Sequence, residues 1–108
     1  MISSAEATLL IEGYKSQSKV LRIFFIARDR SVNVRVTGSV KEFVEGERLT
    51  LVAPNADHCL VVLFGCTFEY GDPREAPDAI RDSVAAKFDG VLTILFPLGE
   101  RLYLFEMR

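Results

Sequence analysis

The residues best suited to chemistry lie close together in one segment. They are Asp57, His58, Cys59 and, seven positions after Cys59, Cys66. A histidine beside a thiol is the pair that activates cysteine nucleophiles, and the same residue types bind zinc. On a single strand over 58–69, however, neighbouring side chains point to opposite faces, so His58 and Cys59 diverge. On such a strand His58 and Cys66 share a face but stand roughly 26 Å apart, at about 3.3 Å per residue. We therefore expect this cluster to be structural, with both cysteines free and buried.

Other catalytic signatures are missing from the sequence. It contains no glycine-rich phosphate loop, no Gly-x-Ser-x-Gly elbow, no Cys-x-x-Cys pair and no Asp-rich calcium loop. Carboxylates gather around Gly46 and over 72–90, where we expect them to face solvent or to meet arginines from elsewhere in the chain. We therefore expect a protein that is not an enzyme and that carries no metal or cofactor.

A second candidate site is the basic region 15–41. It has seven Lys and Arg against one Asp, a net charge of +6, whereas residues 42–108 have six Lys and Arg against twelve Asp and Glu, a net charge of −6. The whole chain sums to −2, which argues against bulk binding of nucleic acid. The separation of charge predicts either a binding surface or two parts of the fold that face each other.

The segment 21–36 predicts two antiparallel strands joined at the sequence Arg-Asp-Arg. An even loop pairs Leu21 with Gly38 and leaves one face wholly apolar. An odd loop would turn Arg22 and Arg28 inward, and burying unpaired charges is costly, so we predict the even register. The other face then mixes aromatic and basic side chains. The candidate ligand-binding residues on it are Arg22, Phe24, Arg28 and Arg35.

Three things would cover this second face. The first is a late helix of the chain itself, predicted over about 77–88, whose narrow apolar stripe and aspartates would meet Phe24 and the arginines. The second is another copy of the protein, which would make a homodimer. The third is an anionic ligand or single-stranded nucleic acid, because aromatic side chains among basic ones suit stacking and phosphate contact. Of these we favour the helix.

Two short motifs in the basic region resemble PilZ domains, which bind a cyclic dinucleotide. The motif Lys15-x-x-x-Lys19 stands where that family has paired arginines, and the segment 33–38 resembles its Asp/Asn-x-Ser-x-x-Gly turn. Both arginines are lysines here, and Arg35 stands at the serine position. The resemblance covers residues 15–38 and implies a small barrel.

Along the rest of the chain, short apolar runs separated by turn residues predict a mainly β fold. The expected strands are 7–14, 20–28, 32–41, 48–53, 58–69, 91–96 and 101–107, with short turns rich in Gly and Pro between them. The last two strands should form a hairpin, with 91–96 buried on both faces. With a late helix over about 77–88 that ends at Gly90, we predict a small antiparallel β-barrel or a strongly curved sheet.

Length and composition describe an ordinary globular domain. The chain has 108 residues, 49% of them hydrophobic and 26% charged, which suits a single domain with one core. No stretch reads as a signal peptide or a membrane span, so we expect a cytoplasmic protein without membrane contact. We expect a binding or protein-interaction module. The alternative is recognition of an anionic ligand, a nucleotide or nucleic acid by the basic hairpin 15–41.

Overall fold

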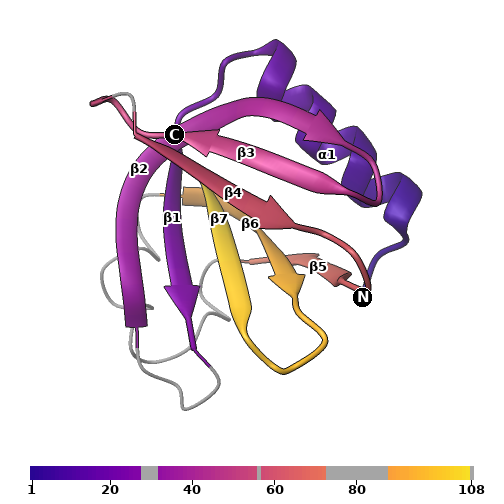
Figure 1. Cartoon of the computed structure of the whole chain (residues 1–108). Helices are drawn as coiled ribbons and strands as arrows, with labels where there is room; N and C mark the ends of the chain where they lie inside the picture. Colours follow the sequence, from indigo (N-terminus) through magenta and orange to yellow (C-terminus); the bar gives the residue numbers. More distant parts are fainter. Residues whose placement is uncertain (28–31, 56, 73–87, 108) are drawn as a thin grey trace.

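The computed structural model describes residues 1–27, 32–55, 57–72 and 88–107. One helix precedes seven strands, and the strands form one antiparallel sheet in the order β4-β3-β2-β1-β7-β6-β5 (Figure 1). The elements are α1 (Ser4–Ser16), β1 (Leu21–Ile26), β2 (Val32–Val44), β3 (Arg48–Val52), β4 (His58–Val62), β5 (Thr67–Gly71), β6 (Phe88–Leu95) and β7 (Arg101–Met107). The predictions of a mainly β fold and of about seven strands are therefore confirmed.

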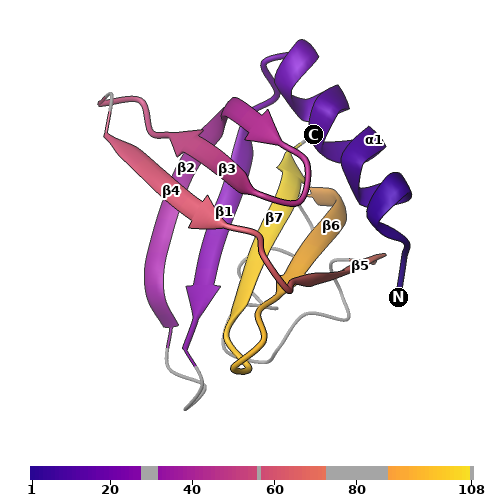
Figure 2. The same cartoon turned by 45° about the vertical axis from the view of Figure 1, so that its right-hand side comes forward.

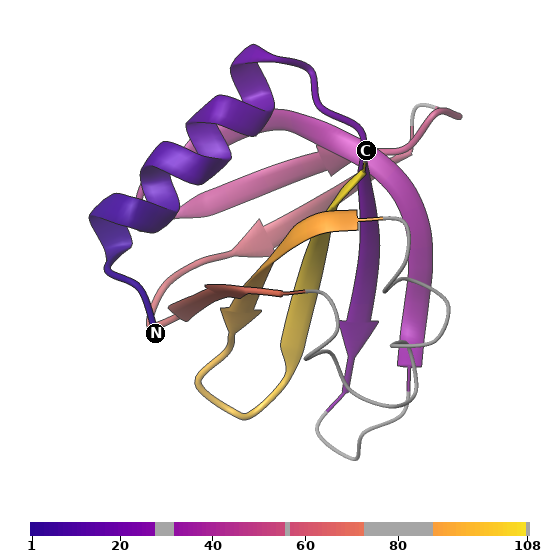
Figure 3. The same cartoon turned by 180° about the vertical axis from the view of Figure 1, so that it is seen from behind.

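Helix α1 replaces the strand predicted over 7–14, so the described helix is early and not late. A capping box starts it: the Ser3 hydroxyl accepts a bond from the Glu6 backbone N–H at 3.1 Å, and the Glu6 carboxylate accepts one from the Ser3 backbone N–H at 3.4 Å. Ala7, Ile11 and Tyr14 then fall on one buried face at helical spacing. That face packs against β2 and β5, so α1 covers one end of the curved sheet (Figure 3).

The late helix predicted over 77–88 lies outside the described residues except at its last position. Phe88 begins strand β6 instead of ending a helix, and Gly90 pairs with Glu106 of β7 instead of closing a helix. The predicted boundary at 88–90 is therefore wrong. The hairpin predicted at the end of the chain is confirmed as β6 and β7, and Val91, Leu92, Thr93 and Ile94 of β6 are all buried.

The strand predicted over 58–69 is two strands at opposite ends of the sheet. A turn separates β4 from β5, with Gly65 at φ 77° and the Cys66 N–H bonded to the Leu63 carbonyl at 3.0 Å. The chain therefore links the two sheet edges at this turn, but β4 and β5 do not pair with each other. The strongly curved sheet is confirmed, and the closed barrel, which the PilZ resemblance also implied, is wrong.

The even register of the first hairpin is confirmed from Leu21, opposite Gly38, to Phe25, opposite Val34. A bulge then pairs Ile26 with Val32 instead of Asn33. Both faces of this part of the sheet are buried: the concave face through Leu21 and Ile23, and the convex face through Phe24, which is 1% exposed, and Ile26. The Phe24 ring stands edge-on to Phe105, with centroids 5.5 Å apart. The second face of the hairpin is thus buried. The helix predicted to cover it, over about 77–88, lies outside the described residues except for Phe88.

Candidate functional site

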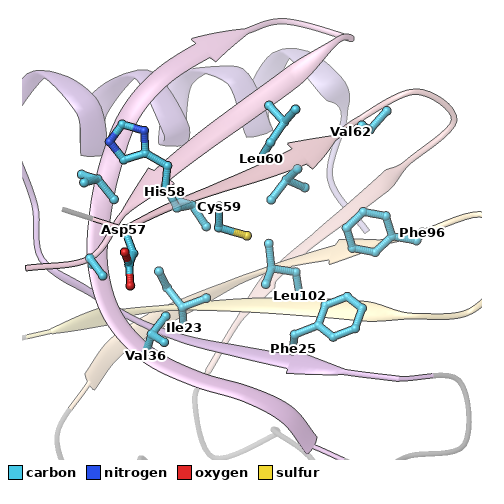
Figure 4. A pocket seen from close by; sticks show the side chains of 15 residues that line it. Ile23, Phe25, Val36, Asp57, His58, Cys59, Leu60, Val62, Phe96 and Leu102 are labelled. Carbon is cyan, nitrogen blue, oxygen red and sulfur yellow. The ribbon is translucent and has the colours of Figure 1, made fainter. Parts of the chain in front are cut away.

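The concave side of the sheet holds an apolar pocket of about 480 Å³. Strands β3 and β4 curl over β1 and β7 (Figure 2), and the pocket lies between the two pairs (Figure 4). Helix α1 fills the other end of the concavity with Ala7, Ile11 and Tyr14. The main walls are the side chains of Ile23, Phe25, Val36, Leu51, Val61, Phe96 and Leu102.

The pocket borders the point where β2 changes partners. Up to Gly38 the strand pairs with β1, and from Ser39 onward it pairs with β3. A Cβ atom on Gly38 would stand 2.6 Å from the Val52 carbonyl oxygen, a distance that no side chain tolerates. Glycine therefore lets the end of β3 approach β2 closely, and together with the register shift between Val40 and Glu42 it lies where β3 and β4 turn over the rest of the sheet.

Three polar side chains border the pocket: Asp57, Cys59 and His58. At its rim Asp57 is held by Asn55, whose side-chain amide donates to the Asp57 carboxylate at 2.7 Å and whose carbonyl accepts the Asp57 backbone N–H at 3.2 Å. The Cys59 thiol points from β4 toward Leu102 (Figure 4). The pocket is thus mainly apolar, with one carboxylate at the rim, one thiol on the wall and His58 at the border.

The cluster of Asp57, His58 and the cysteines is divided between two faces. The His58 ring lies on the outer side of β4, with Nε2 3.3 Å from the Lys41 ammonium, so its predicted divergence from Cys59 is confirmed. Both cysteines are free, as predicted, but Cys59 is exposed and only Cys66 is partly buried. Burial raises the pKa of the Cys66 thiol, and the Glu100 carboxylate adds to that rise. Over the described ranges, no three His, Cys, Asp or Glu side chains gather as metal ligands.

Of the four candidate residues of the basic hairpin, the structure shows Arg22 and Phe24 in contact. Arg22 is half-buried; its guanidinium donates to the Thr37 hydroxyl at 3.0 Å and lies 5.5 Å from the centre of the Phe24 ring. Phe24 is buried, so its ring is not open to stacking on a ligand. Arg35 lies on β2 opposite Phe24, and Arg28 lies outside the described residues. Binding of an anion by this hairpin stays a prediction.

A carboxylate held by two tyrosines lies at the end of the sheet that α1 covers. Glu106 on β7 accepts bonds from the hydroxyls of Tyr14 on α1 at 2.6 Å and Tyr70 on β5 at 2.7 Å. The pKa of Tyr14 is raised, first by burial and then by its hydrogen bond to Glu106 and the negative charge of that carboxylate. The pKa of Tyr70 is raised to about 12 by burial, by its hydrogen bond to Glu106 and by the negative charges of Glu106 and Asp89. Both hydroxyls are therefore neutral donors at pH 7. Gly90 makes room, since a Cβ there would collide with the Tyr70 hydroxyl. The cluster fastens α1 to the sheet.

Sequence reasoning missed both the pocket and the tyrosine cluster. Their residues come from separate strands, and no local spacing connects Tyr14 with Tyr70 and Glu106. The only local signal for the pocket is Gly38, a glycine inside an otherwise good strand pattern, which is typical of a close backbone approach. Among the described residues, no helix is both long and apolar enough to cross a membrane. No protein-family model matches the chain, and no curated protein or solved structure matches it either.

Proposed function

We propose that this protein is a binding module whose concave pocket takes up a small apolar molecule. The observation that carries the proposal is the pocket itself: about 480 Å³, walled by aliphatic and aromatic side chains and open to solvent. Small-molecule sites in proteins have volumes of about 300–1,000 Å³ and join mostly apolar walls to a few polar groups. Burying apolar ligand surface contributes roughly 25 cal/mol per Å², so such walls supply the driving force.

The polar groups narrow the class of ligand. Asp57 brings a carboxylate to the rim, and Asn55 fixes its orientation. A hydroxyl or amine on the ligand would donate a hydrogen bond to this carboxylate, whereas a ligand carboxylate or phosphate placed beside Asp57 would be repelled. The best fit is therefore an apolar body that carries a neutral or cationic donor group.

Fluorescence titration with Nile red, an uncharged apolar dye, tests the proposal. We expect saturable binding to the wild type. Val36→Trp fills the pocket from the β2 wall and should raise the dissociation constant at least about tenfold, a loss of about 1.4 kcal/mol. Val20→Trp is the matched control, because Val20 is exposed outside the pocket, and should leave binding unchanged. The absence of saturable binding, or equal binding to a folded Val36→Trp protein, would contradict the proposal.

A further inference from the structure

Strand β4 ends the sheet on one side, and its backbone shows which residues face outward. The Ala53 N–H bonds to the Asp57 carbonyl at 2.9 Å, and the Leu63 N–H bonds to the Glu47 carbonyl at 2.9 Å. In an antiparallel ladder the bonded pairs alternate, so Cys59 and Val61 complete the set that bonds to β3. The N–H and C=O groups of His58, Leu60 and Val62 therefore point away from β3, to the side on which the described chain places no further strand.

Beyond His58, which contacts the Lys41 ammonium, the side chains on this edge are apolar and exposed. Leu60 is 63% exposed, Val62 is 61% exposed, and Phe64 just beyond the strand is 82% exposed. Strand β4 has the sequence His-Cys-Leu-Val-Val and contains no Lys, Arg, Asp or Glu. Natural proteins protect edge strands with charges, prolines, bulges or covering segments, because a bare apolar edge invites another strand to pair with it.

The opposite edge of the sheet is protected, which makes β4 exceptional within this fold. Ile2 forms a bridge to Phe68 of β5, with the Ile2 N–H bonded to the Phe68 carbonyl at 3.0 Å. Strand β5 also carries the exposed carboxylate Glu69. The N-terminal segment and a charged residue of the strand thus guard β5, whereas β4 has no charged residue of its own and the Lys41 ammonium of β2 lies beside its first residue, His58.

We infer that β4 is a homodimer interface, in which the β4 strands of two copies pair antiparallel about a two-fold axis. The register with Leu60 opposite Leu60 of the second copy also sets His58 opposite Val62, so all three outward-facing residues join the ladder. If one strand slides along the other to the next register that pairs these outward-facing residues, either His58 or Val62 loses its partner within β4. A second copy fits this edge because β4 contains no Lys, Arg, Asp or Glu, so Leu60 meets its own copy and Val62 meets His58 without any charged residue of the strand in the ladder.

The dimer would also change the pocket. Leu60 and Val62 border the pocket although their side chains point to the other face of β4 (Figure 4). In the proposed register Val61 of the second copy lies beside Cys59 on the concave side. The second copy would thereby extend the pocket wall with an apolar side chain. The interface itself rests on the β4 edge alone and not on any ligand.

Analytical ultracentrifugation over a range of protein concentrations tests the interface. The wild type should form a dimer, and Leu60→Lys should raise its dissociation constant at least about tenfold, because two lysines would then face each other across the axis. The matched control is Leu9→Lys on α1, where the leucine is 75% exposed, and it should dimerise like the wild type. A wild type that stays monomeric at high concentration, or a dimer that survives Leu60→Lys, would overturn the inference.

Amide hydrogen exchange of the wild type keeps the test independent of any variant. In the dimer the N–H groups of Leu60 and Val62 should be protected and should exchange faster on dilution, while those of Cys59 and Val61 stay protected throughout. Equal exchange at Leu60 at high and low concentration would overturn the inference. Neither readout involves Nile red, so the interface and the ligand pocket can fail separately.

Discussion

Glu106 shows how a single residue can join elements that are distant in the sequence. Its carboxylate accepts hydrogen bonds from Tyr14 of α1 and Tyr70 of β5 while its backbone pairs with Gly90 of β6. Hydrogen bonds to a charged acceptor contribute about 1.5–3 kcal/mol when they are well buried, so the Tyr14 bond is the stronger support and the more exposed Tyr70 bond the weaker. The cluster therefore couples the docking of α1 to the protonation of two tyrosines.

This coupling predicts a loss of stability in alkali. An unfolded tyrosine has a pKa of about 10, whereas the pKa of Tyr70 in the folded protein is raised to about 12. The folded state thus keeps a proton that the unfolded chain releases, so the stabilisation is complete below about pH 10 and is lost as the pH rises through about 12. Urea unfolding from about pH 8 to about pH 12 should show a smaller alkaline loss for Tyr70→Phe than for the wild type. Identical pH dependences would refute the coupling.

At the same scale, the cysteines show what residue patterns can and cannot predict. The alternation of side chains along a strand correctly separates His58 from Cys59. The prediction that Cys59 is buried is wrong; it rests on the general tendency of free thiols to lie in the core and not on the alternation. In the structure the Cys59 face of β4 lines an open pocket, and that depends on how far β4 stands from β1 and β7, which no local pattern encodes.

At the scale of elements, the close approach of β3 to β2 at Gly38 borders the pocket, and it can be tested. Gly38→Ala puts a Cβ against the Val52 carbonyl and should force the backbones apart, with a loss of about 1–3 kcal/mol in the free energy of unfolding. Gly13→Ala is the matched control in α1, where a new Cβ meets no atom within 4 Å, and it should stabilise the protein by about 0.5–1 kcal/mol. Chemical denaturation measures both. Equal stability of Gly38→Ala and the wild type would mean that the close approach is not required.

The elements themselves were predictable where short-range pairing decides them. The register of β1 with β2 follows from the cost of burying arginine, and the β6–β7 hairpin follows from a turn between two apolar runs. Helix α1 was missed although its signals are present: Ser3 and Glu6 form the capping box, and Ala7, Ile11 and Tyr14 repeat with helical spacing. The apolar run over 7–14 suits a strand as well as a buried helix, and only packing against β2 and β5 decides between them.

At the scale of the whole molecule, the seven strands form one strongly curved sheet that does not close into a barrel. Its two ends, β4 and β5, are consecutive in the chain and are joined by the turn at Gly65, yet they do not pair. Closure depends on the summed twist and bend of seven strands, so the sequence pattern could not distinguish a closed barrel from an open curved sheet. The pocket and the free β4 edge both result from this opening, which is why neither was predicted.

The central claim is that the open concavity binds an apolar molecule, and the reactivity of Cys59 tests it most directly. In a Cys66→Ser protein, the rate of reaction with an aromatic disulfide reagent is measured with and without Nile red. With the dye at about ten times its dissociation constant, the rate should fall about tenfold, because only the unoccupied protein reacts. In the control Cys59→Ser, the dye should not change the reaction of Cys66. A Cys59 rate that stays the same while the dye is bound would place the dye elsewhere and contradict the claim.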